Sequence, residues 1–431
     1  MENVFKNKNF ILIFLGALVS NIGNLFYSFA VSLWILDITG NNAIIQGAYL
    51  GVCGLTFVLF SLVGGVLSDR YNKAKIMYLC DYIKAILIIV SAIIILLNSS
   101  NLALNLVVLF STGIIGNVIG AVFSPASTAL IPAIVEKDQI QQANSYMNVL
   151  SSLQAIIGVC LAAILYAALS ITTLFIIVGI CYLGSAISEM FIKYDYKPAE
   201  HKLTIKETIN DIKEGFRYIK TKKVLASLLP MLILLNFFFA PLDQNFVSYF
   251  VKTDIASTPN YLFHSIIDPA MWSAIFNVVV SVASIIFGIV LSTKTINNNS
   301  GKKVKKWLLG VGIITLLMSV SYYIFVDKNN ILNVFLIIFI VYGFVLGMML
   351  SFINIPTSTI MQTITEEDKL GKVSSITNMV SQGLIPLATF AAGFVITYLG
   401  SAVLLLICSI GFLAVAFFAL FNKAMNNVLS E

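Results

Sequence analysis

Long apolar segments alternate with short polar ones along almost the whole chain. Twelve of these segments are each long enough to cross a bilayer, for which an α-helix needs about 20 residues. They lie near residues 9–37, 42–68, 75–97, 102–127, 143–167, 171–192, 224–251, 269–292, 307–326, 331–355, 372–398 and 402–421. Because backbone polar groups inside lipid must bond within their own segment, the pattern predicts an all-α membrane protein of twelve transmembrane helices.

The composition also indicates lipid as the main solvent. The 431 residues are 59% hydrophobic and only 11% charged, whereas a soluble domain carries about 25% charged residues. Twelve spans leave short loops and one longer one, so there is no room for a sizeable soluble domain. The predicted location is therefore the cell membrane, plasma or inner, with membrane lipids as partners.

The positions of the cations predict the orientation of the chain. The net charge is +6, but lysines and arginines gather in alternate loops, which is a topology signal rather than a sign of nucleic-acid binding. With the N-terminus inside, 23 of the 26 cations are cytoplasmic. Only Lys252 and Lys328 lie outside, and Lys84 lies within a span. Both termini are expected in the cytoplasm, and no nucleic acid is expected as a partner.

The longest cytoplasmic segment, residues 193–223, separates two halves of the chain. Apolar residues recur in it at helical spacing, and a capping-box pattern precedes them. These residues are Ile205, Ile209, Ile212, Phe216 and Ile219, with Thr204 and Glu207 as the capping box. The segment is predicted to be an amphipathic helix, either a plain linker or a partner-binding element. The predicted domains are a six-helix bundle over 1–192, this linker, and a second six-helix bundle over 224–431.

Internal repeats relate the two halves. The run Gly64 to Arg70 at the end of the second span is echoed by residues 288–294 after the eighth. Gly116, followed nine residues later by Pro125, is echoed by Gly347 and Pro356 in the tenth span. Two matches at nearly one offset indicate a duplicated, pseudo-symmetric pair of six-helix bundles, an organisation common in secondary transporters. Two Gly-x-x-x-Gly pairs, Gly116 with Gly120 and Gly343 with Gly347, are predicted to be faces at which helices pack closely.

The segment Gly65-Val66-Leu67-Ser68-Asp69-Arg70-Tyr71-Asn72-Lys73-Ala74-Lys75 resembles the signature of the major facilitator superfamily. Asn72 departs from the usual glycine, and Thr293 stands where the second-half copy would have its carboxylate. A glycine permits close helix approach, and a carboxylate at the membrane edge pairs with basic groups whose separation can accompany gating. The candidate gating residues are Gly65, Asp69, Arg70, Lys73 and Lys84.

Further stretches resemble the drug:proton antiporter branch of this superfamily, typified by macrolide efflux proteins. They cover residues 36–40, 81–84, 124–126, 129–132, 142–144 and 214–218. The resemblance implies efflux driven by proton influx, usually of bulky lipophilic compounds. Lys84 stands where this branch typically has arginine, which keeps the charge but loses the planar fork.

Asp81 and Asp243 are the acids that the sequence places clearly inside spans, where a charge costs about 2.5–3.5 kcal/mol. Lys84 lies one helical turn from Asp81, so the two form either a structural ion pair or a proton-sensitive latch. Asp243 has no cation in its own helical neighbourhood. It is a candidate for proton coupling and for substrate binding, and the alternative is a solvated position near the outer mouth. Asp243 is the preferred coupling group.

The other candidate substrate-binding residues are uncharged polar residues near mid-span. The resemblance implies that helices 1, 4, 7 and 10 line the cavity. These candidates are Asn24, Tyr27, Asn117, Asn236, Asn277 and Tyr342. An enzyme is not indicated, because His201 and His264 fall in loops on opposite sides and no phosphate-cradling glycine loop occurs. No cofactor and no metal are expected.

Together these patterns predict a secondary active transporter that exports a small, lipophilic compound of macrolide or multidrug type by proton-coupled alternating access. Such a monomeric exporter would confer antibiotic resistance. One alternative is an exporter or flippase of an endogenous siderophore, peptide or lysolipid. An alternative of another class is a non-transporting membrane scaffold or sensor.

The cation distribution generates a topology prediction. In intact cells, an impermeant thiol reagent should label Asn260→Cys but not Asn210→Cys or Asn298→Cys, because the last two lie in cation-rich loops. Once the cells are opened, the reagent should label both Asn210→Cys and Asn298→Cys. Labelling of Asn210→Cys in intact cells would contradict the predicted orientation.

Overall fold

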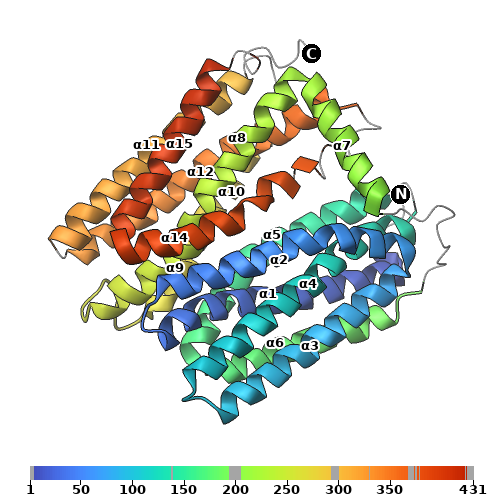
Figure 1. Cartoon of the computed structure of the whole chain (residues 1–431), viewed down its shortest axis with the longest axis horizontal. Helices are drawn as coiled ribbons and strands as arrows, with labels where there is room; N and C mark the ends of the chain where they lie inside the picture. The colour runs from blue at the N-terminus through green and yellow to red at the C-terminus, as the bar shows by residue number, and fades with distance from the viewer. Residues whose placement is uncertain are drawn as a thin grey trace. The chain divides into compact units, whose positions relative to one another are not determined.

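The structure is a computed structural model that describes residues 4–136, 139–193, 205–292, 300–329, 331–366, 373, 376–377, 379–422 and 424 (Figure 1). Every regular element in these ranges is a helix. Among the residues searched, eleven helices are long and apolar enough to cross a membrane. The remaining predicted span, near 143–167, falls in the 29-residue helix α5, Ile140–Ala168. The predicted all-α membrane architecture is therefore confirmed.

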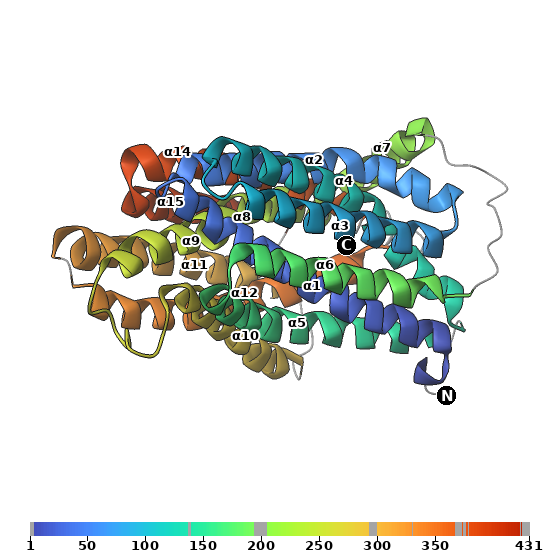
Figure 2. The same ribbon diagram turned by 90° about the horizontal axis from the view of Figure 1, so that it is seen from below.

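The chain forms two compact units, of which unit 1 contains residues 1–39 and 52–208. Helices α3 and α4 pack together, and α6 packs along both α1 and α3, as Figure 2 shows from below. The elements of this unit are η1 Val4–Lys6, α1 Lys8–Ile38, α2 Ala43–Arg70 from residue 52 onward, α3 Lys73–Leu97, α4 Leu102–Ile134, α5 Ile140–Ala168 and α6 Ile171–Met190.

Unit 2 contains residues 40–51 and 209–431, so the first turns of α2 belong to it. Helix α11 packs against α12 and α15, and α10 packs against α12. The elements are α7 Ile205–Thr221 from residue 209 onward, α8 Lys223–Ala240, η3 Pro241–Phe246, α9 Val247–Phe250, η4 Val251–Ile255, α10 Pro269–Ser292, α11 Ser300–Tyr322, η5 Tyr323–Lys328, α12 Leu332–Ile364, α14 Ile385–Leu399 and α15 Ser401–Phe421. Both η3 and η4 are π-helical, so the span from Lys223 to Ile255 is interrupted twice.

Asparagine side chains cap the starts of three helices in unit 1. The side-chain oxygens of Asn7, Asn72 and Asn101 accept bonds from free backbone N–H groups in the first turns of α1, α3 and α4. Asn72 accepts from Lys75 at 3.2 Å. This bond gives a physical reason for Asn72 where the signature that the segment resembles has glycine, since asparagine is among the best N-cap residues.

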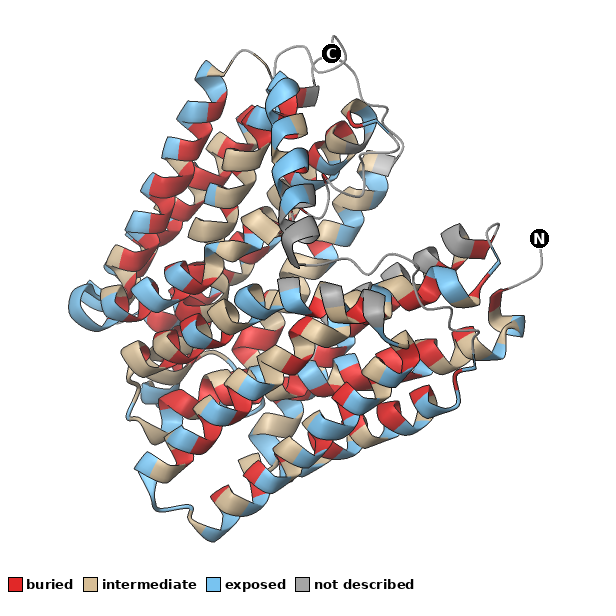
Figure 3. Cartoon of the chain, turned by 45° about the vertical axis from the view of Figure 1, so that its right-hand side comes forward, coloured by how far each residue is buried: buried red, intermediate tan, exposed pale blue. Residues whose placement is uncertain are grey.

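Apolar side chains cover both the cores and the outer surfaces of the helices. Stripes of buried and exposed residues alternate along the helices in Figure 3. Many exposed side chains are large and apolar, such as Leu97 and Phe421 at 75% and 81% exposure. The buried stripes of unit 2 include an aromatic group in which Phe276 stacks on Phe339 with ring centroids 4.3 Å apart. Apolar residues on outer faces suit a lipid solvent.

Helix α7 confirms the helix predicted in the central linker. Ile219 is buried with Leu225, Val373 and Ile376, whereas Lys213 and Arg217 are exposed. Next to α7, the Lys222 ammonium lies 3.6 Å from the Glu366 carboxylate. Residues 209–221 of α7 therefore pack on unit 2. Thr204 and the side chain of Glu207, the predicted capping box, lie outside the described residues.

The two Gly-x-x-x-Gly pairs differ in their surroundings although their sequences correspond. A Cβ built at Gly347 would lie 2.2 Å from the backbone oxygen of Val280, so α10 and α12 are in close contact there. A Cβ at Gly116 meets nothing within 4 Å, and one at Gly120 meets the Lys84 ammonium at 3.6 Å. The predicted close-packing face is confirmed for Gly347 and wrong for Gly116, because only the former faces another backbone.

This contrast generates a stability prediction for repeat-equivalent positions. Gly347→Ala should lower the free energy of unfolding by about 1–3 kcal/mol, since overpacking forces backbone shifts. Gly116→Ala is the matched control and should leave stability unchanged or slightly raised. Thermal unfolding of the purified variants in detergent measures both. Equal stability of the two variants would contradict the packing at Gly347.

Candidate functional site

The predicted polar residues of unit 1 come from α1 and α4. Asn24 is exposed, and its side-chain oxygen accepts a hydrogen bond from the Tyr182 hydroxyl at 3.3 Å. Tyr27 is half-buried, with its ring 5.2 Å from that of Phe175. α1 therefore carries Asn24 and Tyr27 toward α6, where Tyr182 and Phe175 lie.

Three of the predicted substrate-binding asparagines each donate one amide N–H to their own helix. Asn117, Asn236 and Asn277 each donate to the carbonyl oxygen four residues earlier, at 2.8, 3.0 and 2.9 Å. All three are half-buried. An amide bonded in this way still presents its carbonyl oxygen as an acceptor. These residues can accept a hydrogen bond from a solute, and they sit in spans without needing a partner helix.

Tyr342 occupies a different environment from the other predicted binding residues. It is 4% exposed, its ring stacks on Phe276, and its hydroxyl lies 3.3 Å from the hydroxyl of Thr315. These contacts are those of a packing residue in the core of unit 2.

Asp243 lies in the π-helical segment η3, which starts at Pro241 directly after α8. Proline lacks a backbone N–H and interrupts the regular hydrogen-bond ladder, and π-helical turns frequently occur at functional sites. Asp243 is half-buried and has no hydrogen bond or ion pair with another described residue. An acid in this setting is a candidate for binding a proton or a cationic solute.

Asn245, two residues after Asp243, is a polar group that sequence reasoning did not select. It is fully buried, and its amide nitrogen donates to the backbone oxygen of Thr389 on α14 at 3.2 Å. Its side-chain oxygen has no partner among the described residues. The sequence could have pointed to Asn245, because it is a second polar residue close to Asp243 in an apolar span.

The predicted gate lies at the turn between α2 and α3. Helix α2 extends to Arg70, and Lys73 begins α3. The side chains of Asp69 and Arg70 lie outside the described residues. A Cβ at Gly65 meets nothing within 4 Å, whereas one at Gly64 would lie 2.0 Å from the backbone oxygen of Ala121. The expectation that Gly65 permits close helix approach is therefore wrong, and the adjacent Gly64 has that role.

Asp81 and Lys84 do not form the direct ion pair that their spacing suggested. Among the residues that the structure describes, no ion pair joins them, and the Lys84 ammonium lies 5.2 Å from the centre of the Tyr182 ring. Asp81 is 1% exposed. The charge of Lys84 still acts electrostatically on Asp81. The interpretation of Asp81 and Lys84 as a direct ion pair is therefore wrong. Lys84 instead lies over the Tyr182 ring and acts on Asp81 without direct contact.

Glu189 is the acid that sequence reasoning missed. It is the residue before the last one of α6. In the structure it is fully buried, and neither carboxyl oxygen has a hydrogen-bond partner among the described residues. The signal in the sequence was an acid inside the apolar segment 171–192, but only packing shows that α1 covers it.

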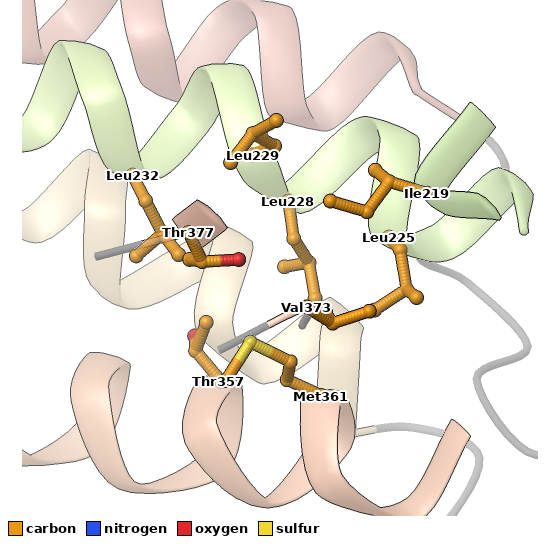
Figure 4. Close-up of a pocket in the computed structure, with 9 residues that line it drawn as sticks. All are labelled: Ile219, Leu225, Leu228, Leu229, Leu232, Thr357, Met361, Val373 and Thr377. Carbon is orange, nitrogen blue, oxygen red and sulfur yellow. The ribbon is translucent and has the colours of Figure 1, made fainter. Parts of the chain in front are cut away.

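The described residues also contain a small apolar pocket in unit 2, with a cavity volume of about 10 Å³ (Figure 4). It is lined by Ile219, Leu225, Leu228, Leu229, Leu232, Thr357, Met361, Val373 and Thr377. The Thr357 hydroxyl is buried there without a partner among the described residues. None of the predicted substrate-binding residues lines this pocket. No group of three or more His, Cys, Asp or Glu side chains able to hold a metal occurs in the described part of the chain.

The membrane-length helices and their apolar outer faces define a multi-pass membrane protein. The sequence profile of the Major Facilitator Superfamily matches residues 10–389. The chain belongs to this superfamily, and its fold is that of the superfamily. It is accordingly placed among transporters rather than among enzymes.

Relatives with curated names are similar at low identity. The chain is 27% identical over 393 residues to the uncharacterized MFS-type transporter YkuC of Bacillus subtilis, covering 87% of this chain and 82% of that one. It is 27% identical over 254 residues to macrolide efflux protein A of Streptococcus pyogenes, covering 57% and 60%. It is 26% identical over 186 residues to the staphyloferrin A transporter of Staphylococcus aureus, covering 42% and 43%.

A solved structure shows the same fold. The nucleoside transporter NupG superposes with a TM-score of 0.73 at 11% identity, over 96% of this chain and 100% of that one. At this identity the likeness concerns the fold alone.

Proposed function

We propose that this chain is a secondary active transporter that exports a small, lipophilic compound of macrolide or multidrug type by proton-coupled alternating access. The observation that carries the proposal is Asp243, a half-buried acid in a π-helical interruption of a span. A group that gains or loses charge inside a span can change which conformation is favoured. The similarity to macrolide efflux protein A supports efflux as the direction.

The proposed binding residues suit a bulky solute with few hydrogen-bonding groups. Asn117, Asn236 and Asn277 each present one acceptor on a helix that is otherwise apolar. A small number of polar groups in apolar surroundings is typical of sites that orient lipophilic ligands. Asn24 and Tyr27 complete the proposed set, and Asp243 would favour a solute that carries a positive charge.

The proposed orientation places both termini in the cytoplasm, in the cell membrane and among its lipids. The gate would then lie on the cytoplasmic side, at the turn between α2 and α3. Asp69, Arg70 and Lys73 are proposed to act at this turn, and Lys84 further along α3. The proposed working form is a monomer that uses no cofactor and catalyses no covalent step.

A second candidate within transport is export or flipping of an endogenous siderophore, peptide or lysolipid. Similarity to the staphyloferrin A transporter favours the siderophore member of this group. Everted membrane vesicles separate these possibilities, because an exporter accumulates its substrate inside them. Accumulation of a labelled macrolide that collapses with the pH gradient supports the leading proposal. Accumulation of a siderophore alone supports the second candidate, and a vesicle panel without any transport leaves a membrane scaffold or sensor.

The gate proposal generates a prediction for Asp69. Asp69→Asn should lower transport about tenfold or more, the usual size of a coupling between a switch and a binding site. Asp69→Glu, which keeps the charge, should retain more activity. Both are measured as initial uptake into everted vesicles at matched amounts of folded protein. Unchanged transport by Asp69→Asn would remove this residue from the mechanism.

The coupling proposal generates a prediction for Asp243. Asp243→Asn should abolish the dependence of efflux on the pH gradient, because the amide cannot carry the proton whose charge favours one conformation. Uptake is measured in everted vesicles with the gradient intact and collapsed.

Asp327→Asn is the matched control, because it makes the same change at an exposed acid of unit 2. It should keep the full response to the gradient. If Asp243→Asn responds like this control, Asp243 is not the coupling group and Asp81 takes its place.

A further inference from the structure

A cluster of buried polar side chains lies where α1, α3 and α6 pack together in unit 1. Ser185 on α6 donates a hydrogen bond to the backbone oxygen of Gly16 on α1 at 3.1 Å. The carboxyl groups of Asp81 on α3 and Glu189 on α6 both lie within reach of the Ser185 side chain, and the charge of Asp81 acts on Glu189. We refer to the two acids as the Asp81–Glu189 pair.

Gly16 allows α1 to cover the carboxyl group of Glu189. A Cβ built at this position would lie 3.3 Å from Glu189 Cγ, from Glu189 Oε1 and from Ser185 Oγ. A little further along the same contact, Ser188 on α6 donates to the backbone oxygen of Leu12 at 2.9 Å. The backbone of α1 therefore forms one wall of the cluster and closes it from the surroundings.

The oxygens of the pair are largely without hydrogen-bond donors. Asp81 Oδ2 and both carboxyl oxygens of Glu189 have no partner among the described residues, although the two side chains are 1% and 0% exposed. A buried carboxylate is costly unless it is paired or neutralised. Because the hydrogen bonds of the cluster do not compensate two carboxylates, each acid needs either a nearby positive charge or a proton.

Among the groups that act on the two acids, Lys84 is the cation. From α3, Lys84 and the Cys80 thiol act on the cluster, and from α6 the Tyr182 hydroxyl lies near Asp81. The only charged residues of α1 are Lys8 and Asp37 at its two ends, and α4 and α5 contain none. With both acids ionised and Lys84 protonated, the cluster would keep a net negative charge inside the unit.

We infer that Asp81 and Glu189 share one exchangeable proton, which makes this pair a proton-binding site in unit 1 that is separate from Asp243. Lys84 balances one carboxylate and the shared proton neutralises the other, since like charges at close range do not both ionise without cost. A proton fits the cluster better than a metal ion, because the described residues offer no group of three or more metal-binding side chains.

The position of the pair links it to the predicted gate. Asp81 lies eight residues after Lys73, the first residue of α3, or about 12 Å along the helix. Glu189 is one residue before the end of α6. Loss of the proton would make the two helices repel at the ends nearest the α2–α3 turn and the linker. This use of the site in a transport cycle rests on the proposed function, whereas the proton site itself does not.

Proton counting on the purified full-length protein in detergent, without any substrate, tests the site. A pH-indicator dye reports the protons released when the pH is raised from mildly acidic to mildly alkaline, above the range in which exposed carboxyls titrate. Glu189→Gln and Asp81→Asn should each release about one proton fewer per chain than the wild-type protein. The double variant should also release about one proton fewer, and not two, because a coupled pair titrates as a unit. Glu136→Gln, an exposed acid at the end of α4, is the control and should keep the wild-type count.

An unchanged count in both single variants overturns the site, and a loss of two protons in the double variant overturns the sharing. Infrared spectroscopy gives a second measurement, and the Asp243→Asn protein is used for it because this variant lacks the other proposed proton site. A protonated carboxyl C=O band that disappears on alkalinisation is expected in this variant, and its absence overturns the proposal. A protein that shows this band but moves no compound in vesicles refutes the proposed function and leaves the proton site standing.

Discussion

The need to satisfy every polar group inside lipid shapes this protein more than any other constraint. Backbone N–H and C=O groups find partners in lipid only within helices, so helices carry the chain across the membrane. Asparagine caps supply acceptors where helices begin, and mid-span asparagines donate to their own helix. Side chains also bond between helices. Gln154 on α5 donates to the backbone oxygen of Ala17 at 3.0 Å, and the hydroxyls of Ser91 and Thr112 lie 2.6 Å apart.

Among the described residues, some of the buried polar atoms that escape this rule lie near the proposed functional elements. Asp81 Oδ2, the Glu189 carboxyl group and the side-chain oxygen of Asn245 are buried without partners among the described residues. Asn245 adjoins Asp243, and Glu189 lies beside Asp81. A fully satisfied interior would be more stable, so retained unpaired groups are natural candidates for exchangeable protons or for solutes. Among the described residues, unit 1 thus holds the Asp81–Glu189 pair and unit 2 holds Asp243, each in its own surroundings.

Glycines determine how closely the helices approach, and the two repeats use them differently. Gly64 faces the backbone of Ala121 in unit 1, and Gly347 faces that of Val280 in unit 2. The repeat-equivalent Gly116 faces open space, while Gly120 makes room for the Lys84 ammonium. The two halves therefore share the Gly-x-x-x-Gly pattern, but in unit 1 the space beside it is used by the charged cluster that contains Lys84. This asymmetry fits two units with different tasks in one transporter.

The sequence by itself determined the all-α membrane fold, the helical linker and the superfamily, because apolar length, periodicity and short motifs are local properties of the chain. It also placed Asp81 and Asp243 within spans. Only the tertiary structure separated Gly64 from Gly65, showed that Lys84 lies over Tyr182 instead of pairing with Asp81, and buried Glu189 under α1. Each of these depends on which residue of another helix lies opposite. Sequence spacing fixes the face of a helix on which a side chain lies, but not the distance to the next helix or the depth at which it is covered.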